Sequence, residues 1–242
     1  RSLLSERPDM PQGCKAAMPF SRSRKERNKP SSGRNRVNFM RPPIRAFIAV
    51  ELDERVKRAL VLFQDHLRTA KADVKWTAPE HMHATLKFLG DIQPEAVEDI
   101  EKAIARTAAR FPAFHMDIGE LGAFPRIDDP RVIWAGITKR AHLLTEIADQ
   151  LDKELGFLET SAADPQDGSG THARRPAFMP HITLGRSRTE TTSRPLAELL
   201  QNTHIPAGLS QKVQRICLMR SELFPKGPVH HLLYSVELGG EA

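Results

Sequence analysis

The tetrad His-x-Thr-Leu occurs twice in this sequence, at His83–Leu86 and at His181–Leu184. Each copy lies in a stretch typical of a β-strand, in which every second side chain points to the same face. One face of each strand therefore carries an imidazole and a hydroxyl, while the two apolar side chains turn to the other face. Two such strands brought together would surround a small space with two acid–base groups and two hydroxyl donors. This set can move protons to and from a phosphate ester without a metal ion.

The segments around the tetrads alternate strands with amphipathic helices, twice in the same order. Residues 45–52 and 131–138 are short apolar strands, each followed by a stretch with apolar residues at helical spacing and then by a tetrad strand. Glu-Leu leading into Phe-Pro and a basic residue also occurs twice, at 120–126 and 222–226. We infer an internal duplication folded as two α+β lobes, with two antiparallel sheets facing a central cleft and helices outside.

The net charge of +6 originates at the N-terminus, where residues 1–45 hold twelve Lys or Arg and three Asp or Glu. The remainder is mildly acidic, so its charge does not indicate binding along a phosphate backbone. Residues 1–44 lack apolar periodicity, and we expect a basic disordered extension before a domain over 45–242. The extension is a nucleic-acid-binding arm, a targeting segment, or sequence upstream of a start at Met40. The polar residues 159–175 predict a flexible insertion.

Several classes of protein are disfavoured by composition. No apolar run reaches the roughly 18–20 residues that span a bilayer, so we expect no membrane association. Cys14 and Cys217 are too few for a disulfide framework or a cysteine-based zinc site. We expect a monomeric, cytoplasmic protein.

Two alternatives compete with metal-independent catalysis. His81 and His83 would share a strand face and, with His181, could ligate a metal in a metal-dependent phosphoesterase. The second tetrad offers no matching ligand, because Met179 stands two residues before its histidine. The other alternative is a non-catalytic module that binds RNA ends. The remaining histidines, His230 among them, show no constellation and are interpreted as surface or helix residues.

The sequence resembles the 2H phosphoesterase superfamily, and within it the RNA 2′,3′-cyclic phosphodiesterases once described as 2′-5′ RNA ligases. The resemblance runs from Arg45 to the C-terminus through the segments RAFIAVEL, WTAPEHMHATLKFLG, GAFPR with PRVIWAG, MPHITLGR and SELFPKGP. The sequence departs from that pattern at His81, where Asn is frequent, and at His230, where Tyr is common. These departures concern substrate contacts rather than the tetrads.

The resemblance implies hydrolysis of 2′,3′-cyclic phosphates, on RNA 3′ ends or cyclic nucleotides, to 2′-phosphomonoesters without a cofactor. It also implies joining or cleaving of 2′-5′ linkages under some conditions. It assigns His83 as the proton donor to the 3′ oxygen and His181 as the proton acceptor from water, an order that the residues alone do not decide. Thr85 and Thr183 would hydrogen-bond the non-bridging phosphate oxygens.

Three residues after the tetrads are candidates for substrate binding. The guanidinium of Arg186 suits a phosphate, but strict alternation from His181 points it to the wrong face, so a bulge or strand end is required. Phe88 is a candidate base-stacking platform, although alternation favours the core for it. Lys87 shares the face of the first tetrad histidine by alternation and would add positive potential there.

Overall fold

The structure is a computed structural model that describes residues 41–158, 178–189, 193–225 and 227–239, all within the compact unit Met40–Ala242. The predicted extension over 1–44 and insertion over 159–175 therefore lie, apart from residues 41–44, outside the described residues. The elements in chain order are β1 (Ile44–Glu51), α1 (Glu54–Arg68), β2 (Val74–Trp76), the 3-10 turn η1 (Pro79–His81), β3 (His83–Ile92), the 3-10 turn η2 (Pro94–Ala96), α2 (Val97–Ala108), β4 (Phe114–Arg126), β5 (Asp129–Lys139), α3 (Ala141–Glu154), β6 (His181–Ser187), α4 (Arg194–Asn202), β7 (Ser210–Val213), β8 (Arg215–Phe224) and β9 (Gly227–Glu237).

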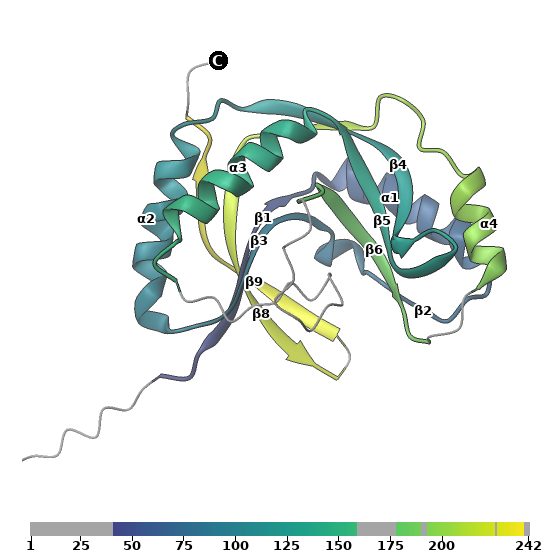
Figure 1. Cartoon of the computed structure of the whole chain (residues 1–242), viewed down its shortest axis with the longest axis horizontal. Helices are drawn as coiled ribbons and strands as arrows, with labels where there is room; N and C mark the ends of the chain where they lie inside the picture. Colours follow the sequence, from purple (N-terminus) through teal and green to yellow (C-terminus); the bar gives the residue numbers. More distant parts are fainter. Residues whose placement is uncertain (1–40, 159–177, 190–192, 226, 240–242) are drawn as a thin grey trace, which may run out of the picture. The chain divides into compact units, whose positions relative to one another are not determined.

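The strands form an antiparallel sheet in the order β7-β4-β5-β6-β3-β1-β8-β9, with β2 pairing on β6 (Figure 1). The order falls into two matching halves, β7-β4-β5-β6 and β9-β8-β1-β3. These halves are the two predicted sheets, and the predicted α+β duplication is confirmed. The structure adds that the two sheets are joined, because β3 and β6 pair at Ala84 and Ile182.

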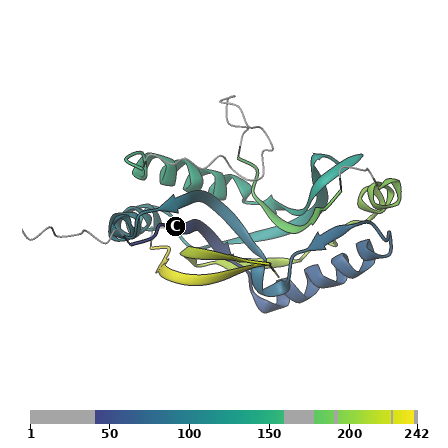
Figure 2. The same cartoon turned by 90° about the horizontal axis from the view of Figure 1, so that it is seen from below.

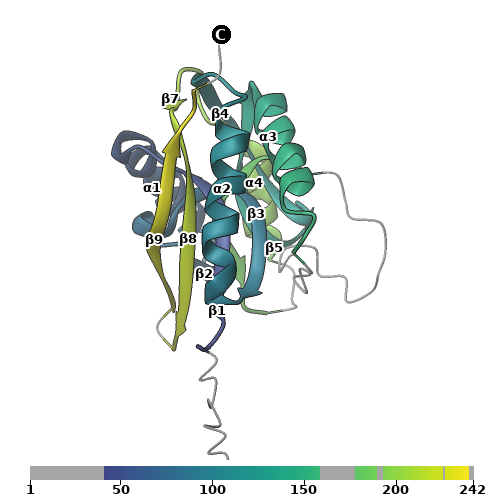
Figure 3. The same cartoon turned by 90° about the vertical axis from the view of Figure 1, so that its left-hand side faces the viewer.

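Helices α1 and α3 each pack against the half of the sheet that does not contain the strand before them in the chain. Helix α1 follows β1 in the chain but packs with α4, and its Gln64 bonds to β6. Helix α3 follows β5 but contacts β3 and α2 (Figure 3). Figure 2 shows α1 and α3 on opposite sides of the strands. Each half of the duplication thus supplies a helix to the other half's sheet, which ties the two lobes into one core.

The helices bury the apolar stripes that the sequence predicts. Val56, Leu60 and Leu67 of α1 are fully buried, as are Ile100 and Ile104 of α2. They join the apolar face of the sheet in a single hydrophobic cluster. Burial on this scale stabilises the fold by about 25 cal/mol for each Å² of apolar surface removed from water. None of the described helices is long and apolar enough to cross a membrane.

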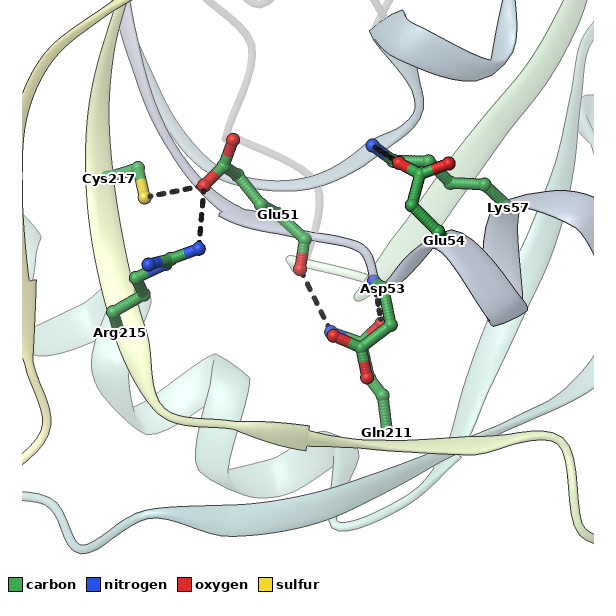
Figure 4. Close-up of polar contacts among 7 residues, drawn as sticks. All are labelled: Glu51, Asp53, Glu54, Lys57, Gln211, Arg215 and Cys217. Carbon is green, nitrogen blue, oxygen red and sulfur yellow. Dashed lines mark hydrogen bonds and ion pairs between the residues drawn. The ribbon is translucent and has the colours of Figure 1, made fainter.

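A buried glutamine connects β1 to the far lobe (Figure 4). The side chain of Gln211 on β7 accepts from the Asp53 amide and donates to the Glu51 carbonyl, both at 2.9 Å. The Glu51 carboxylate in turn accepts from the Cys217 thiol at 3.5 Å and pairs with Arg215. Burial raises the pKa of Cys217 to about 12, with the adjacent Glu51 charge adding to the shift. This cysteine is therefore a structural thiol.

Candidate active site

The two tetrads lie on the two central strands and meet at their second residues, Ala84 and Ile182. Both of these residues are buried, and so are the tetrad leucines, which confirms the predicted alternation. The strands are antiparallel, so one step from the Ala84–Ile182 pair sets His83 against Thr183 and the other sets Thr85 against His181. The sheet therefore presents two histidines and two threonines on one face, arranged about an approximate two-fold axis.

A bulge at each tetrad leucine changes which side chains reach this face. On β3, Thr85 pairs with Ala49 of β1 and Lys87 pairs with the adjacent Ile48, so Leu86 is the extra residue. On β6, Thr183 pairs with Trp134 of β5 and Gly185 pairs with the adjacent Ile133, so Leu184 is the extra residue. A bulge reverses the alternation that follows it. Arg186 and Phe88, each five residues after a tetrad histidine, consequently turn onto the histidine face.

The bulge also corrects the placement of Lys87. Alternation predicted this side chain on the face of His83 and Thr85, and that prediction is wrong. Because Leu86 is extra, Lys87 turns to the opposite face, where its amine bonds and ion-pairs with Asp152 of α3. Its side chain is only 10% exposed there. Lys87 therefore does not line the site, and it is not retained as a substrate-binding residue.

A cavity of about 420 Å³ opens over the histidine face. Among the residues that line it are His83, Thr85, Phe88, Thr183 and Arg186. Ligand sites commonly occupy about 300–1,000 Å³, so this cavity is at the small end of that range. His181 is not among the lining residues, although Thr183 of the same tetrad is.

The His83 ring is enclosed by aromatic neighbours. It stacks on Phe47 with 4.7 Å between ring centroids, and it forms an edge-on contact with His230 at 5.5 Å between centroids. Burial lowers the pKa of His83 to about 4, and repulsion from His230 contributes next, whereas a backbone hydrogen bond to His81 opposes the shift. His181 lowers the pKa of His83 further by a smaller amount, so the two tetrad histidines are close enough to interact electrostatically. With this pKa, the His83 ring is neutral at pH 7.

The His181 ring is held by the backbone just before its own strand, β6. Its Nδ1 lies 2.6 Å from the carbonyl oxygen of Met179. A carbonyl only accepts, so Nδ1 donates, and the neutral ring then carries its lone pair on Nε2. The ring packs edge-on against Phe124, 5.0 Å between centroids, and near Trp134. Both tetrad histidines thus bond to the backbone two residues before themselves.

Three residues at the site were missed or misplaced by the sequence reasoning. His230 was interpreted as a surface or helix residue, but it lines the cavity and contacts Phe47, His81 and His83. Phe47 was assigned only to a strand. Gln64 interrupts the apolar stripe of α1, and a polar residue on such a stripe is a usable signal. It is 1% exposed and donates to the carbonyls of Leu184 and Thr77, at 2.7 and 2.8 Å.

The metal alternative receives no geometric support. His81 ends the turn η1 instead of sharing the strand of His83. Within 41–158, 178–189, 193–225 and 227–239, no group of three or more His, Cys, Asp or Glu side chains is arranged to hold a metal ion. The triad of His81, His83 and His181 is therefore not a ligand set in the described structure.

A duplicated sheet with one His-x-Thr tetrad on each central strand defines the two-histidine class of phosphoesterase folds. Residues 50–134 match the family described as LigT like Phosphoesterase. A protein of Methanothermobacter thermautotrophicus named RNA 2′,3′-cyclic phosphodiesterase is 33% identical over 190 residues, covering 77% of this chain and 95% of that protein. The chain therefore belongs to the LigT-like phosphoesterase family.

Solved structures agree with this assignment. The crystal structure of TT0787 of Thermus thermophilus has a TM-score of 0.66 and 32% identity, covering 82% of this chain and 100% of that one. The structure of E. coli LigT in apo form has a TM-score of 0.63 at 21% identity, covering 81% of this chain and 98% of that one. The second likeness concerns the fold alone.

Proposed function

We propose that this protein hydrolyses 2′,3′-cyclic phosphates of RNA or nucleotides to 2′-phosphomonoesters. The observation that supports the proposal is the antiparallel meeting of the two tetrads, which sets two imidazoles and two hydroxyls on one face of the sheet, and the cavity opens over this face beside His83, Thr85 and Thr183. The similarity to a protein named RNA 2′,3′-cyclic phosphodiesterase supports the choice of reaction.

The reaction needs one proton removed and one supplied. His181 takes a proton from water through Nε2 as the water oxygen bonds to phosphorus. The bond from phosphorus to the 3′ oxygen breaks, and His83 donates a proton to that oxygen. The ribose keeps the phosphate on its 2′ oxygen. The reaction consumes one water molecule and requires no oxidant or other co-reactant.

His83 must be charged to act as the donor, whereas the protein alone lowers its pKa to about 4. A bound phosphodiester carries a negative charge beside the ring, and an adjacent negative charge raises the pKa of an imidazole. The donor is therefore charged in the complex with substrate rather than in the free protein. Binding of substrate or of the 2′-phosphate product takes up a proton.

The remaining groups hold the phosphate. Thr85 and Thr183 donate hydroxyl hydrogen bonds to its non-bridging oxygens, whose charge grows in the transition state. The Arg186 guanidinium contributes a fixed positive charge with fork geometry. Phe88 provides a ring face for the base of the terminal nucleotide.

Product analysis tests the proposal. An RNA oligonucleotide ending in a 2′,3′-cyclic phosphate is incubated with the protein in the presence of a chelator. We expect a 2′-phosphate terminus as the exclusive product. Binding of the oligonucleotide without turnover would support the non-catalytic module, and loss of activity on chelation with recovery on adding zinc would support a metal enzyme.

A further inference from the structure

The β8–β9 hairpin forms one wall of the cavity and extends beyond it. Ser221 pairs with His230 and Leu223 pairs with Pro228, and all four residues line the cavity. Cross-strand partners share a face, so these two pairs form a continuous strip on one side of the hairpin. Phe224 follows Leu223 and turns to the other side.

The strip begins beside His83, the candidate catalytic histidine, and ends in solvent. At its inner end the His230 ring contacts His83 and Phe47, with centroid separations of 5.5 and 5.0 Å. At its outer end Leu223 is 69% exposed. An apolar side chain held in the open at the rim of a polar site offers a surface that a flat, partly apolar group can cover.

A lysine from the other lobe lies at the tip of the hairpin. Lys75 of β2 pairs with Arg186 of β6, so the two cationic side chains leave the same face of the sheet. The Lys75 Nζ is 3.8 Å from the position that a β-carbon would take on Gly227. Gly227 has a φ of +144°, a conformation that favours glycine, at the start of β9 next to Pro228. Lys75 is exposed, and no carboxylate among the described residues pairs with its amine.

The cavity is too small for much more than one nucleotide. Its volume of about 420 Å³ is at the lower end for ligand sites. The chain of a longer RNA must therefore leave over the rim. An RNA chain alternates a base, which offers a flat face, with a phosphate, which carries a charge. The rim offers an apolar strip and a lysine side by side.

We propose that the strip of Ser221, Leu223, Pro228 and His230, together with Lys75, binds the nucleotide on the 5′ side of the one bearing the cyclic phosphate. The base of that nucleotide lies on Leu223 and Pro228, and the phosphate joining the two nucleotides contacts Lys75. This subsite rests on the proposed function. It makes an RNA oligonucleotide, rather than a free cyclic nucleotide, the favoured substrate class.

The test compares a dinucleotide ending in a 2′,3′-cyclic phosphate with 2′,3′-cyclic AMP. For the wild-type protein we expect kcat/KM to favour the dinucleotide by about tenfold, the scale of one phosphate contact and one covered base. Lys75→Ala should lower this preference by about fivefold. It should also reduce the slope of log kcat/KM against log salt for the dinucleotide by about 0.7, the value for one phosphate contact on a single strand.

Two variants of the hairpin form a matched pair. Leu223→Asp places a negative charge on the strip and should abolish the preference for the dinucleotide. Phe224→Asp places the same charge one residue away, on the other side of the hairpin, and should retain the preference. Equal loss in both variants would overturn the subsite, because it would reflect the charge of the hairpin rather than contact with the strip.

The outcomes separate the two proposals. Turnover of both substrates with equal kcat/KM, or a preference that Lys75→Ala leaves intact, overturns the subsite while the proposed function stands. Turnover of neither substrate overturns the proposed function. In that case the subsite is tested by the dissociation constants of the 2′-phosphorylated dinucleotide and of 2′-AMP. The subsite requires that the dinucleotide bind more tightly than 2′-AMP and that Lys75→Ala remove this difference.

Discussion

The ring of His230 on β9 stands edge-on to the ring of His83 on β3, at 5.5 Å between centroids and 85° between planes. Both pKa values are lowered to about 4, in each case first by burial. Repulsion from His230 is the second cause at His83. A proton on one ring therefore disfavours a proton on the other, which makes protonation of His83 depend on an anion in the cavity.

Replacing His230 with Phe should raise the pKa of His83 while keeping an aromatic edge against it. The value should remain below 6.5, since burial persists. NMR titration of the His83 ring in the free protein measures the shift. His231→Phe is the control, because His231 lies 3.8 Å from the Glu222 carboxylate and is not among the causes of the His83 shift. An unchanged pKa in His230→Phe would show that the ring contact carries no electrostatic coupling.

The same shifts predict that acid destabilises the fold. A histidine with a lowered folded-state pKa binds fewer protons than it does in the unfolded chain, so its stabilising effect is complete above pH 6.5 and is lost as the pH falls towards 4. For His83 the loss is on the order of 3 kcal/mol. Urea unfolding at pH 7 and pH 4.5 measures it. His83→Asn, which does not titrate there, should show a smaller difference between the two pH values; an equal difference would contradict the assignment.

The two tetrad histidines should be inseparable in kinetics. His83→Ala and His181→Ala should each lower kcat by about 10²–10⁴, because each removes one proton transfer of a single step. The double variant should lose little more than the worse single variant, since either loss alone disables that step. Thermal unfolding reports whether each variant is folded. Additive losses in well-folded variants would indicate that the two rings act in separate steps.

Periodicity predicts the tetrad strands because it depends only on local alternation. It identifies the duplication, the buried faces of the helices and the shared face of each His-x-Thr pair. It does not predict the extra residue at Leu86 or at Leu184, because a bulge is defined by the register of the neighbouring strand. That is why alternation misplaced Lys87, and why Arg186 required a bulge that the sequence itself did not locate. His230 was missed for a related reason: it reaches the cavity only through the pairing of β9 with β8.

The two bulges turn Arg186 onto the histidine face and Lys87 away from it, so the two residues should differ in their effect on kinetics. Arg186→Ala should lower kcat/KM by about 10², because the cavity loses its phosphate-facing guanidinium. Lys87→Ala should leave kcat/KM within about twofold, because that amine faces α3 and pairs with Asp152. Its effect should appear instead as a small loss of thermal stability. Steady-state kinetics on 2′,3′-cyclic AMP distinguishes the two, and a large kinetic loss in Lys87→Ala would restore its place at the substrate.

Gln64 is a buried group that bonds to the second bulge, whose Leu184 carbonyl also accepts from the Thr77 amide at 2.9 Å. Its amide donates to the carbonyl of Leu184, the extra residue of β6, and to that of Thr77. Gln64→Leu keeps the size of the side chain but removes both donors, which should cost about 1–3 kcal/mol of stability. If the bulge relaxes, Arg186 turns away from the cavity, so kcat/KM should fall as well. Gln150→Leu, on the partly exposed side of α3, is the control for the substitution itself.

A double-mutant cycle separates this positioning role from a general loss of stability. On the hypothesis that Gln64 acts on the reaction only by directing Arg186, Gln64→Leu should lower kcat/KM markedly in the wild-type background and hardly at all in Arg186→Ala. Measurements well below the melting temperature of every variant keep unfolding out of the comparison. Independent, additive effects would mean that the Leu184 bulge persists without its buried donor, and that the register of β5 and β6 alone sets the direction of Arg186.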